Sequence, residues 1–139
     1  MDNVKEWLMR GRNLEAEIKQ LEKAKTDAFV KACGGAIDTS VERVQGGGGN
    51  GTEEKFLKYI EYDRMINERV GELMAVKAEI IKCINAVEKT IYRAVLIAYY
   101  INCMTWEKVA EELGYEVRWI YQLHKKAIKD IVIHYKGMV

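Results

Sequence analysis

Apolar residues recur at helical spacing through most of this 139-residue chain, and they first do so in residues 1–32. One narrow seam lies there among Glu, Lys, Arg and Gln, weakened at two of its positions by Gly11 and Lys25. The seam consists of Trp7, Gly11, Leu14, Ile18, Leu21, Lys25 and Ala28. A seam this narrow predicts an amphipathic helix that packs against a single partner helix, as in a coiled coil.

A second and longer seam occupies residues 52–91. Thr52 is a good N-cap, and Glu53 and Glu54 suit the positive end of a helix dipole. The seam consists of Phe56, Tyr59, Ile66, Val70, Leu73, Ile80, Ile84, Val87 and Ile91, interrupted by Asp63 and Lys77. We expect either an antiparallel hairpin with the first helix or a homodimer through the long helices. Periodicity alone does not separate these two pairings.

Between the two seams, residues 33–51 contain seven glycines, too many for regular structure. The run from Gly46 to Gly51 lacks the Gly-Lys-Ser/Thr ending of a phosphate-binding loop, and no strand precedes it. We therefore interpret residues 33–51 as a flexible connector. Residues 36–44 within it favour a short helix or a docking segment, without an assignable role.

The last part of the chain, residues 92–139, predicts two short helices broken at Gly114. Val109, Ala110 and Leu113 share one face of the first short helix, which Thr105 would cap. Gly114 can take the positive φ that ends a helix in a tight turn. Ile120, Leu123, Ala127 and Ile131 share one face of the second helix. This combination indicates a helix-turn-helix, whose second helix lies in the DNA major groove; the alternative is a helical hairpin that only packs a core.

The opposite face of the second helix carries side chains suited to DNA. Because the first turns of a recognition helix lie deepest in the groove, we expect the base-reading residues to be Val117, Arg118, Tyr121 and Gln122. We expect the phosphate contacts to be Thr105, Lys125, Lys126 and Lys129. For any one of these lysines alone, a solvated surface charge is an equal alternative. Trp106 is expected to pack the two helices together, whereas Trp119 could stack on the preceding helix or meet the DNA backbone.

Charge is informative through its distribution rather than its total. The net charge is only +1 at pH 7, and residues 52–91 carry seven basic and eight acidic residues. Residues 117–136 carry five basic residues against one acidic residue, so the basic excess coincides with the expected recognition helix.

Several other classes of protein find no support in the composition. With 49% hydrophobic and 31% charged residues and no proline, the chain is typical of a helical globular or coiled-coil protein. Its three cysteines are widely spaced, which favours reduced thiols in the cytoplasm over metal ligands or disulfides. No apolar run reaches the ~18 residues of a membrane span. No nucleophile, carboxylate dyad or metal cluster is recognisable, so we expect neither an enzyme nor a cofactor.

The C-terminal pattern also resembles a known family. The residues that carry the resemblance are Leu96, Tyr100, Thr105-Trp106-Glu107, Val109-Ala110, Leu113-Gly114, Ile120, Gln122, Leu123, Ala127 and Ile128. They resemble region 4 of sigma-70-type factors, and Tyr100, Thr105-Trp106 and Ile120–His124 resemble the RinA/ArpU-like regulators of Gram-positive phages. The resemblance implies an all-α, DNA-binding activator of phage or prophage genes that works with bacterial RNA polymerase.

Two departures from the sigma pattern narrow this expectation. Val117-Arg118 stands where sigma region 4 has an Arg-Glu pair, so we expect a target other than a sigma-type promoter element. Nothing resembles sigma region 2, so an activator of this kind would recruit or assist polymerase. The alternatives are a DNA-packaging protein like a phage small terminase subunit, and a protein-interaction module that binds RNA polymerase or a sigma factor.

Overall fold

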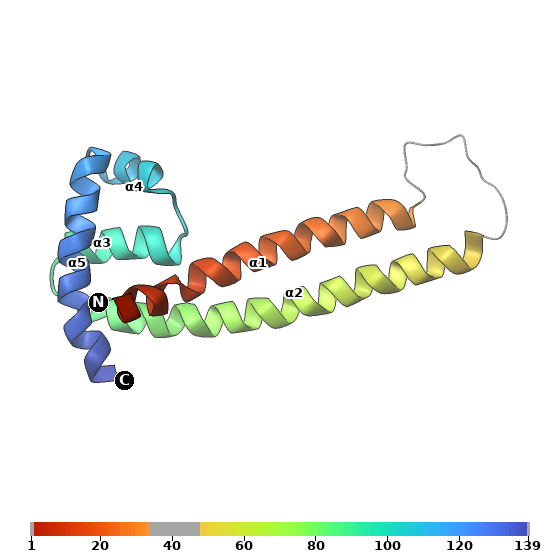
Figure 1. Cartoon of the computed structure of the whole chain (residues 1–139), viewed down its shortest axis with the longest axis horizontal. Coiled ribbons are helices and arrows are strands. Elements are labelled where there is room, and N and C mark those ends of the chain that lie inside the picture. Colours follow the sequence, from red (N-terminus) through yellow and green to blue (C-terminus); the bar gives the residue numbers. More distant parts are fainter. Residues whose placement is uncertain (1, 34–47, 139) are drawn as a thin grey trace. The chain divides into compact units, whose positions relative to one another are not determined.

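The computed structural model describes residues 2–33 and 48–138 (Figure 1). These residues form an all-α protein, as the sequence predicts, and no β-strand occurs among them. The helices are α1 (Asp2–Ala32), α2 (Gly48–Asn85), α3 (Thr90–Leu96), α4 (Trp106–Leu113) and α5 (Val117–Met138), and a π-helical turn, η1 (Ile97–Ile101), directly follows α3. Most of the expected connector, including residues 36–44, lies outside the described residues.

The long helix α2 is placed differently from the expected span of residues 52–91. It begins at Gly48, inside the expected connector, and ends at Asn85. The amides of Ala86 and Val87 donate to carbonyls three residues back, which closes the helix with tight turns. The guanidinium of Arg93 then donates to the carbonyl oxygens of Val87 and Glu88 at 2.6 and 2.8 Å. These bonds stabilise a break before α3, near the end of the hydrophobic seam at Ile91, where periodicity alone leaves open whether the helix continues or bends.

The chain divides into two compact units, Ala16–Gly71 and Met1–Glu15 with Glu72–Val139. In Ala16–Gly71, α1 and α2 lie side by side in opposite directions (Figure 1). The polar interruptions Lys25 and Asp63, one from each seam, meet in this unit, where Lys25 Nζ lies 2.8 Å from Asp63 Oδ1. This hydrogen bond raises the pKa of Lys25 above its ordinary value. In this unit the long helices therefore pair within one chain, and each polar interruption is matched by its opposite charge.

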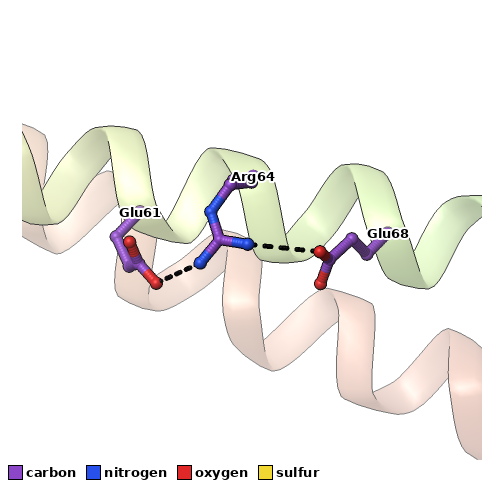
Figure 2. A network of polar contacts seen from close by, with 3 residues as sticks. All are labelled: Glu61, Arg64 and Glu68. Carbon is purple, nitrogen blue, oxygen red and sulfur yellow. Dashed lines mark hydrogen bonds and ion pairs between the residues drawn. The ribbon is translucent and has the colours of Figure 1, made fainter.

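Arg64 marks a solvated face of α2 in the same unit. Its guanidinium bridges Glu61 and Glu68, one helical turn away on either side (Figure 2). All three side chains are more than half exposed. Exposed pairs of this kind contribute at most about 1 kcal/mol, so they hold the side chains in place without deciding the fold.

The unit formed by Met1–Glu15 and Glu72–Val139 contains two hydrophobic clusters. The first consists of Val4, Leu8, Ile80, Cys83, Ile84, Val87, Leu96, Tyr100, Ile101, Ala127, Ile128 and Ile131. The second consists of Val95, Ala98, Val109, Ala110, Ile120 and Leu123. The expected DNA-binding domain, residues 92–139, thus shares its core with the start of α1 and the end of α2.

Gly11 lies at a close approach between α1 and the turn η1. It is buried, and a Cβ added there would lie 3.4 Å from the carbonyl oxygen of Tyr100 and 3.9 Å from the side chains of Ile80 and Lys77. A methyl group fits this space in ordinary contact, whereas a branched side chain does not. The position therefore limits size rather than backbone conformation.

We predict that Gly11→Ala stabilises the protein by about 0.5–1 kcal/mol, because alanine has the higher helix propensity. Gly11→Leu should instead destabilise it by about 1–3 kcal/mol through overpacking against the Tyr100 carbonyl. Urea denaturation measures both changes, and Gly71→Ala on the exposed part of α2 is a control for propensity alone. Equal gains from Gly11→Ala and Gly11→Leu would contradict the close approach.

Candidate nucleic-acid interface

The connection from α4 to α5 has the turn geometry that the sequence predicts. Thr105 is the N-cap of α4, and its hydroxyl accepts a hydrogen bond of 3.2 Å from the amide of Lys108. Gly114 ends α4 in the left-handed region, with φ of 79°. The amides of Gly114 and Tyr115 both donate to the carbonyl oxygen of Ala110, at 3.0 Å each. These bonds satisfy the end of α4 and allow α5 to begin three residues later, at Val117.

α4 and α5 pack through the faces expected from the sequence. Val109 and Ala110 of α4 are 0% and 4% exposed and lie in the cluster that contains Ile120 and Leu123 of α5. The small side chain of Ala110 suits two helices that approach closely. Val95 of α3 lies in the same cluster, so three helices share this part of the core.

An aromatic stack joins η1, α4 and α5. The rings of Tyr99 and Trp106 lie parallel, with centroids 3.7 Å apart and an interplanar angle of 9°. Trp106 also meets the rings of His124 and Tyr121 edge-to-face, at 4.7 and 5.7 Å. Trp106 therefore packs the two helices together, as predicted. The side of α5 that carries Tyr121 therefore faces Trp106.

Arg12 of α1 completes this stack from a distant part of the sequence. Its guanidinium lies over the Tyr99 ring, 4.0 Å from the centroid. One nitrogen, Nη1, donates to the carbonyl oxygens of Tyr99 and Met104 at 2.8 and 2.9 Å. The carbonyls near the end of a helix lack partners within it. A cation there supplies a hydrogen-bond donor and also complements the negative end of the helix dipole. Arg12 thus ties α1 to both ends of the link before α4, a role that local sequence patterns do not reveal.

The same link contains the one positive φ of a non-glycine residue in the described chain, at Cys103 with φ of 56°. A left-handed conformation costs a non-glycine residue roughly 1–2 kcal/mol. The surrounding hydrogen bonds offset this cost: Asn102 and Met104 donate to the carbonyls of Ile97 and Ala98, in addition to the contacts of Arg12. The approach of the chain to Thr105 is therefore fixed rather than loose.

A buried polar pair connects α5 to η1. Tyr100 Oη and His124 Nε2 share a hydrogen bond of 2.7 Å. Burial, with a smaller contribution from the positive charge of Lys5, lowers the pKa of His124 to about 4. Burial likewise raises the pKa of Tyr100 above its ordinary value. Both side chains are therefore neutral at pH 7, and His124 acts as a structural residue between the core and the surface.

The outward face of α5 presents most of the expected DNA-contacting residues. Arg118, Gln122, Lys125 and Lys129 follow one another at spacings of three and four residues, and all are exposed. The Arg118 side chain is 88% exposed and lies 3.9 Å from Glu116, a pairing too open to hold it. Together these four side chains form the α5 stripe, one polar and basic row along a helix whose other face is buried.

The remaining expected contacts lie beside the α5 stripe. Tyr121 is 49% exposed with one edge against Trp106, and Lys126 lies over the Trp119 ring at 5.7 Å. Trp119 is 46% exposed, and its ring contacts Lys126 of the same helix. Val117 is partly buried against the second cluster, so it supports the turn more than it extends outward. Thr105 is exposed, with its hydroxyl oxygen accepting from the helix it caps.

The described residues do not meet the requirements of a metal site or of a membrane-spanning helix. No group of three or more His, Cys, Asp or Glu side chains within residues 2–33 and 48–138 could hold a metal ion. Within the same residues, no helix combines the length and the apolar character that a membrane crossing requires.

Comparison with known proteins identifies a family for most of the chain. The family described as "Protein of unknown function (DUF1492)" matches residues 35–132. This range includes α2, the turn η1, the α4–α5 connection and most of α5. No curated protein and no solved structure matches the chain.

We predict that Arg12→Ala destabilises the protein by about 2–3 kcal/mol, because two carbonyl groups lose a charged donor. Arg12→Lys should restore only part of the loss, since an ammonium group cannot reproduce the flat guanidinium on the Tyr99 ring. Arg10→Ala is the matched control: its ion pair with Glu79 is exposed and contributes about 1 kcal/mol or less. Equal free energies of unfolding for the Arg12 and Arg10 variants would contradict this role.

We also predict that His124 makes stability fall with acid. An unfolded histidine titrates near 6.5, whereas the folded pKa is about 4. The stability is therefore fully present above pH ~6.5 and is lost as the pH falls toward ~4. The loss is at most roughly 3 kcal/mol, and less because the ring is only partly buried. Thermal unfolding at several pH values should show a shallower dependence on pH in His124→Gln than in the unaltered protein.

Proposed function

Because this chain belongs to the DUF1492 family, whose description assigns no function, we propose one from the geometry of α4 and α5: sequence-specific binding of double-stranded DNA by a helix-turn-helix. The observation that carries the proposal is the α5 stripe, an exposed row of Arg118, Gln122, Lys125 and Lys129. It lies on the helix that follows a capped α4 and the left-handed turn at Gly114. A recognition helix must have one face held in place by packing and an opposite face that is exposed and polar.

Each side chain of the α5 stripe has a suitable partner on DNA. Arginine can pair with guanine through two hydrogen bonds, and glutamine can do the same with adenine. Arg118 and Gln122 lie in the first two turns of α5 and are the best candidates for reading bases. Lys125, Lys126 and Lys129 lie further along and would contact phosphates, with Thr105 at the start of α4 as a further phosphate contact. Tyr121, held by Trp106, would contact bases at the edge of the stripe, and Val117 would only approach them.

We propose that DNA binding serves the control of transcription in the bacterial cytoplasm, with a phage or prophage gene as target. The resemblance to sigma region 4-like regulators supports this role. The exposed carboxylates of Glu107, Glu111 and Glu112 on α4 would repel phosphates, which favours a protein partner for that surface. Bacterial RNA polymerase is the partner that the resemblance suggests.

The deciding experiment selects duplexes from a random pool at ~0.15 M salt and titrates the winner against scrambled DNA. A reader of sequence should bind its motif at least roughly a thousandfold more tightly than scrambled DNA. Weak binding without a motif would instead favour a packaging protein. Absence of binding at low salt would exclude the proposal and favour a protein-interaction module.

With the selected duplex, we predict that Arg118→Ala and Gln122→Ala each reduce discrimination between sequences by about 1–3 kcal/mol. Lys125→Ala and Lys129→Ala should weaken binding to every sequence and reduce the salt slope by about one. Arg64→Ala is a matched control, since this arginine is also exposed but lies on α2 in the other unit. Equal losses on all sequences from Arg118→Ala would contradict its base-reading role.

A further inference from the structure

A second basic group lies beside the α5 stripe and comes from a different part of the chain. Lys89, the residue before α3, and Tyr92 in its first turn lie with Lys126 and Lys129 of α5 around an open hollow of about 440 Å³. Glu88 and Asp130 complete its lining. We name this feature the Lys89 hollow. Three lysines against two carboxylates leave it with a net positive charge.

Lys89 and Lys126 of the hollow contact aromatic rings, and among the described residues no carboxylate neutralises any of its lysines. Within residues 2–33 and 48–138, no ion pair engages Lys89, Lys126 or Lys129. Lys89 Nζ lies over the Tyr92 ring, 5.3 Å from its centroid. This cation–π contact holds the ammonium group at the rim of the hollow without neutralising its charge.

The Lys89 hollow lies on one flank of the α5 stripe, and α4 lies on the other flank. At 3.6 residues per turn, Tyr121 and Lys126 lie on opposite sides of the row that contains Arg118, Gln122, Lys125 and Lys129. α4 covers the Tyr121 side through Trp106, and the Lys89 hollow lies on the Lys126 side. The stripe therefore has a polar element on each flank: Thr105 at the start of α4 and Lys89 at the start of α3.

We propose that the Lys89 hollow binds a backbone phosphate of DNA on the strand across the major groove from the one that Thr105 approaches. This inference rests on the proposed function. A helix of about 10–12 Å diameter fills a groove about 12 Å wide, so groups on both flanks meet a sugar–phosphate wall. An ammonium group binds a phosphate as a point charge and needs no exact orientation. Lys89 is then a phosphate contact that carries no sequence information.

The two carboxylates of the hollow give the proposal a second test. Asp130 directly follows Lys129 on α5 and would repel a phosphate in the hollow. Removal of its charge should therefore strengthen DNA binding. A gain of affinity is diagnostic because a misfolded variant cannot produce it.

The experiment uses the full chain with two labelled duplexes, the selected sequence and a scrambled one, titrated over a range of salt concentrations. Lys89→Ala should weaken binding to both duplexes and reduce the slope of log affinity against log salt by about 0.9, the value for one phosphate contact. Asp130→Asn should strengthen binding to both. Lys82→Ala, an exposed lysine in the last turn of α2, is the control and should leave the slope unchanged.

The outcomes separate the two proposals. A wild-type chain that binds neither duplex overturns the proposed function and this inference together. A wild-type chain that binds, with an unchanged slope in Lys89→Ala and no gain in Asp130→Asn, overturns the phosphate site alone. A Lys89→Ala loss confined to the selected duplex also overturns it, because that result indicates a base contact.

Discussion

The guanidinium group of Arg12 is the contact on which the arrangement of the C-terminal helices depends. It satisfies carbonyls at both ends of the link between η1 and α4, and it closes the stack that Tyr99 and Trp106 begin. Hydrophobic burial brings these helices together but is non-directional. The hydrogen bonds of Arg12 and its flat contact with the Tyr99 ring fix the orientation of the link before α4. The contact of Trp106 with Tyr121 extends this constraint to α5.

The core of this unit is specified by a few polar atoms within a large apolar volume. Tyr100 is 2% exposed, yet its hydroxyl group finds His124 on a different helix. A buried hydroxyl without a partner is costly, so this pair disfavours other rotations of α5 about its axis. The rotation of α5 decides which side chains form its outward row. Fold stability and the proposed recognition of DNA are thus linked through one hydrogen bond.

The sequence predicted best what depends on local chemistry. Thr105 as a cap, the left-handed Gly114 and the buried face of α5 all follow from spacing within one or two turns. The contacts of Arg12 with Tyr99 and Met104, and the position of Lys89 beside α5, could not be predicted, because these residues lie far apart along the chain. The position of the break after Asn85 was not predicted for a different reason: Arg93 supports it through hydrogen bonds to two nearby carbonyl oxygens, and hydrophobic periodicity carries no information on such bonds.

The π-helical turn η1 holds one residue more than an α-helical path would need. Asn102 donates to the carbonyl five residues back, at Ile97, which is the mark of this wider turn. The number of residues between Ile97 and Ile101 therefore decides whether this turn is π-helical or α-helical. A one-residue deletion between Ile97 and Ile101 would let η1 close as ordinary α-helix, and the segments that follow would keep nearly the same rotation, because the wider turn already absorbs the extra residue. The outward face of α5 is therefore insensitive to the loss of one residue at this turn, whereas the same loss inside α5 would rotate the residues after it by about 100° relative to those before it.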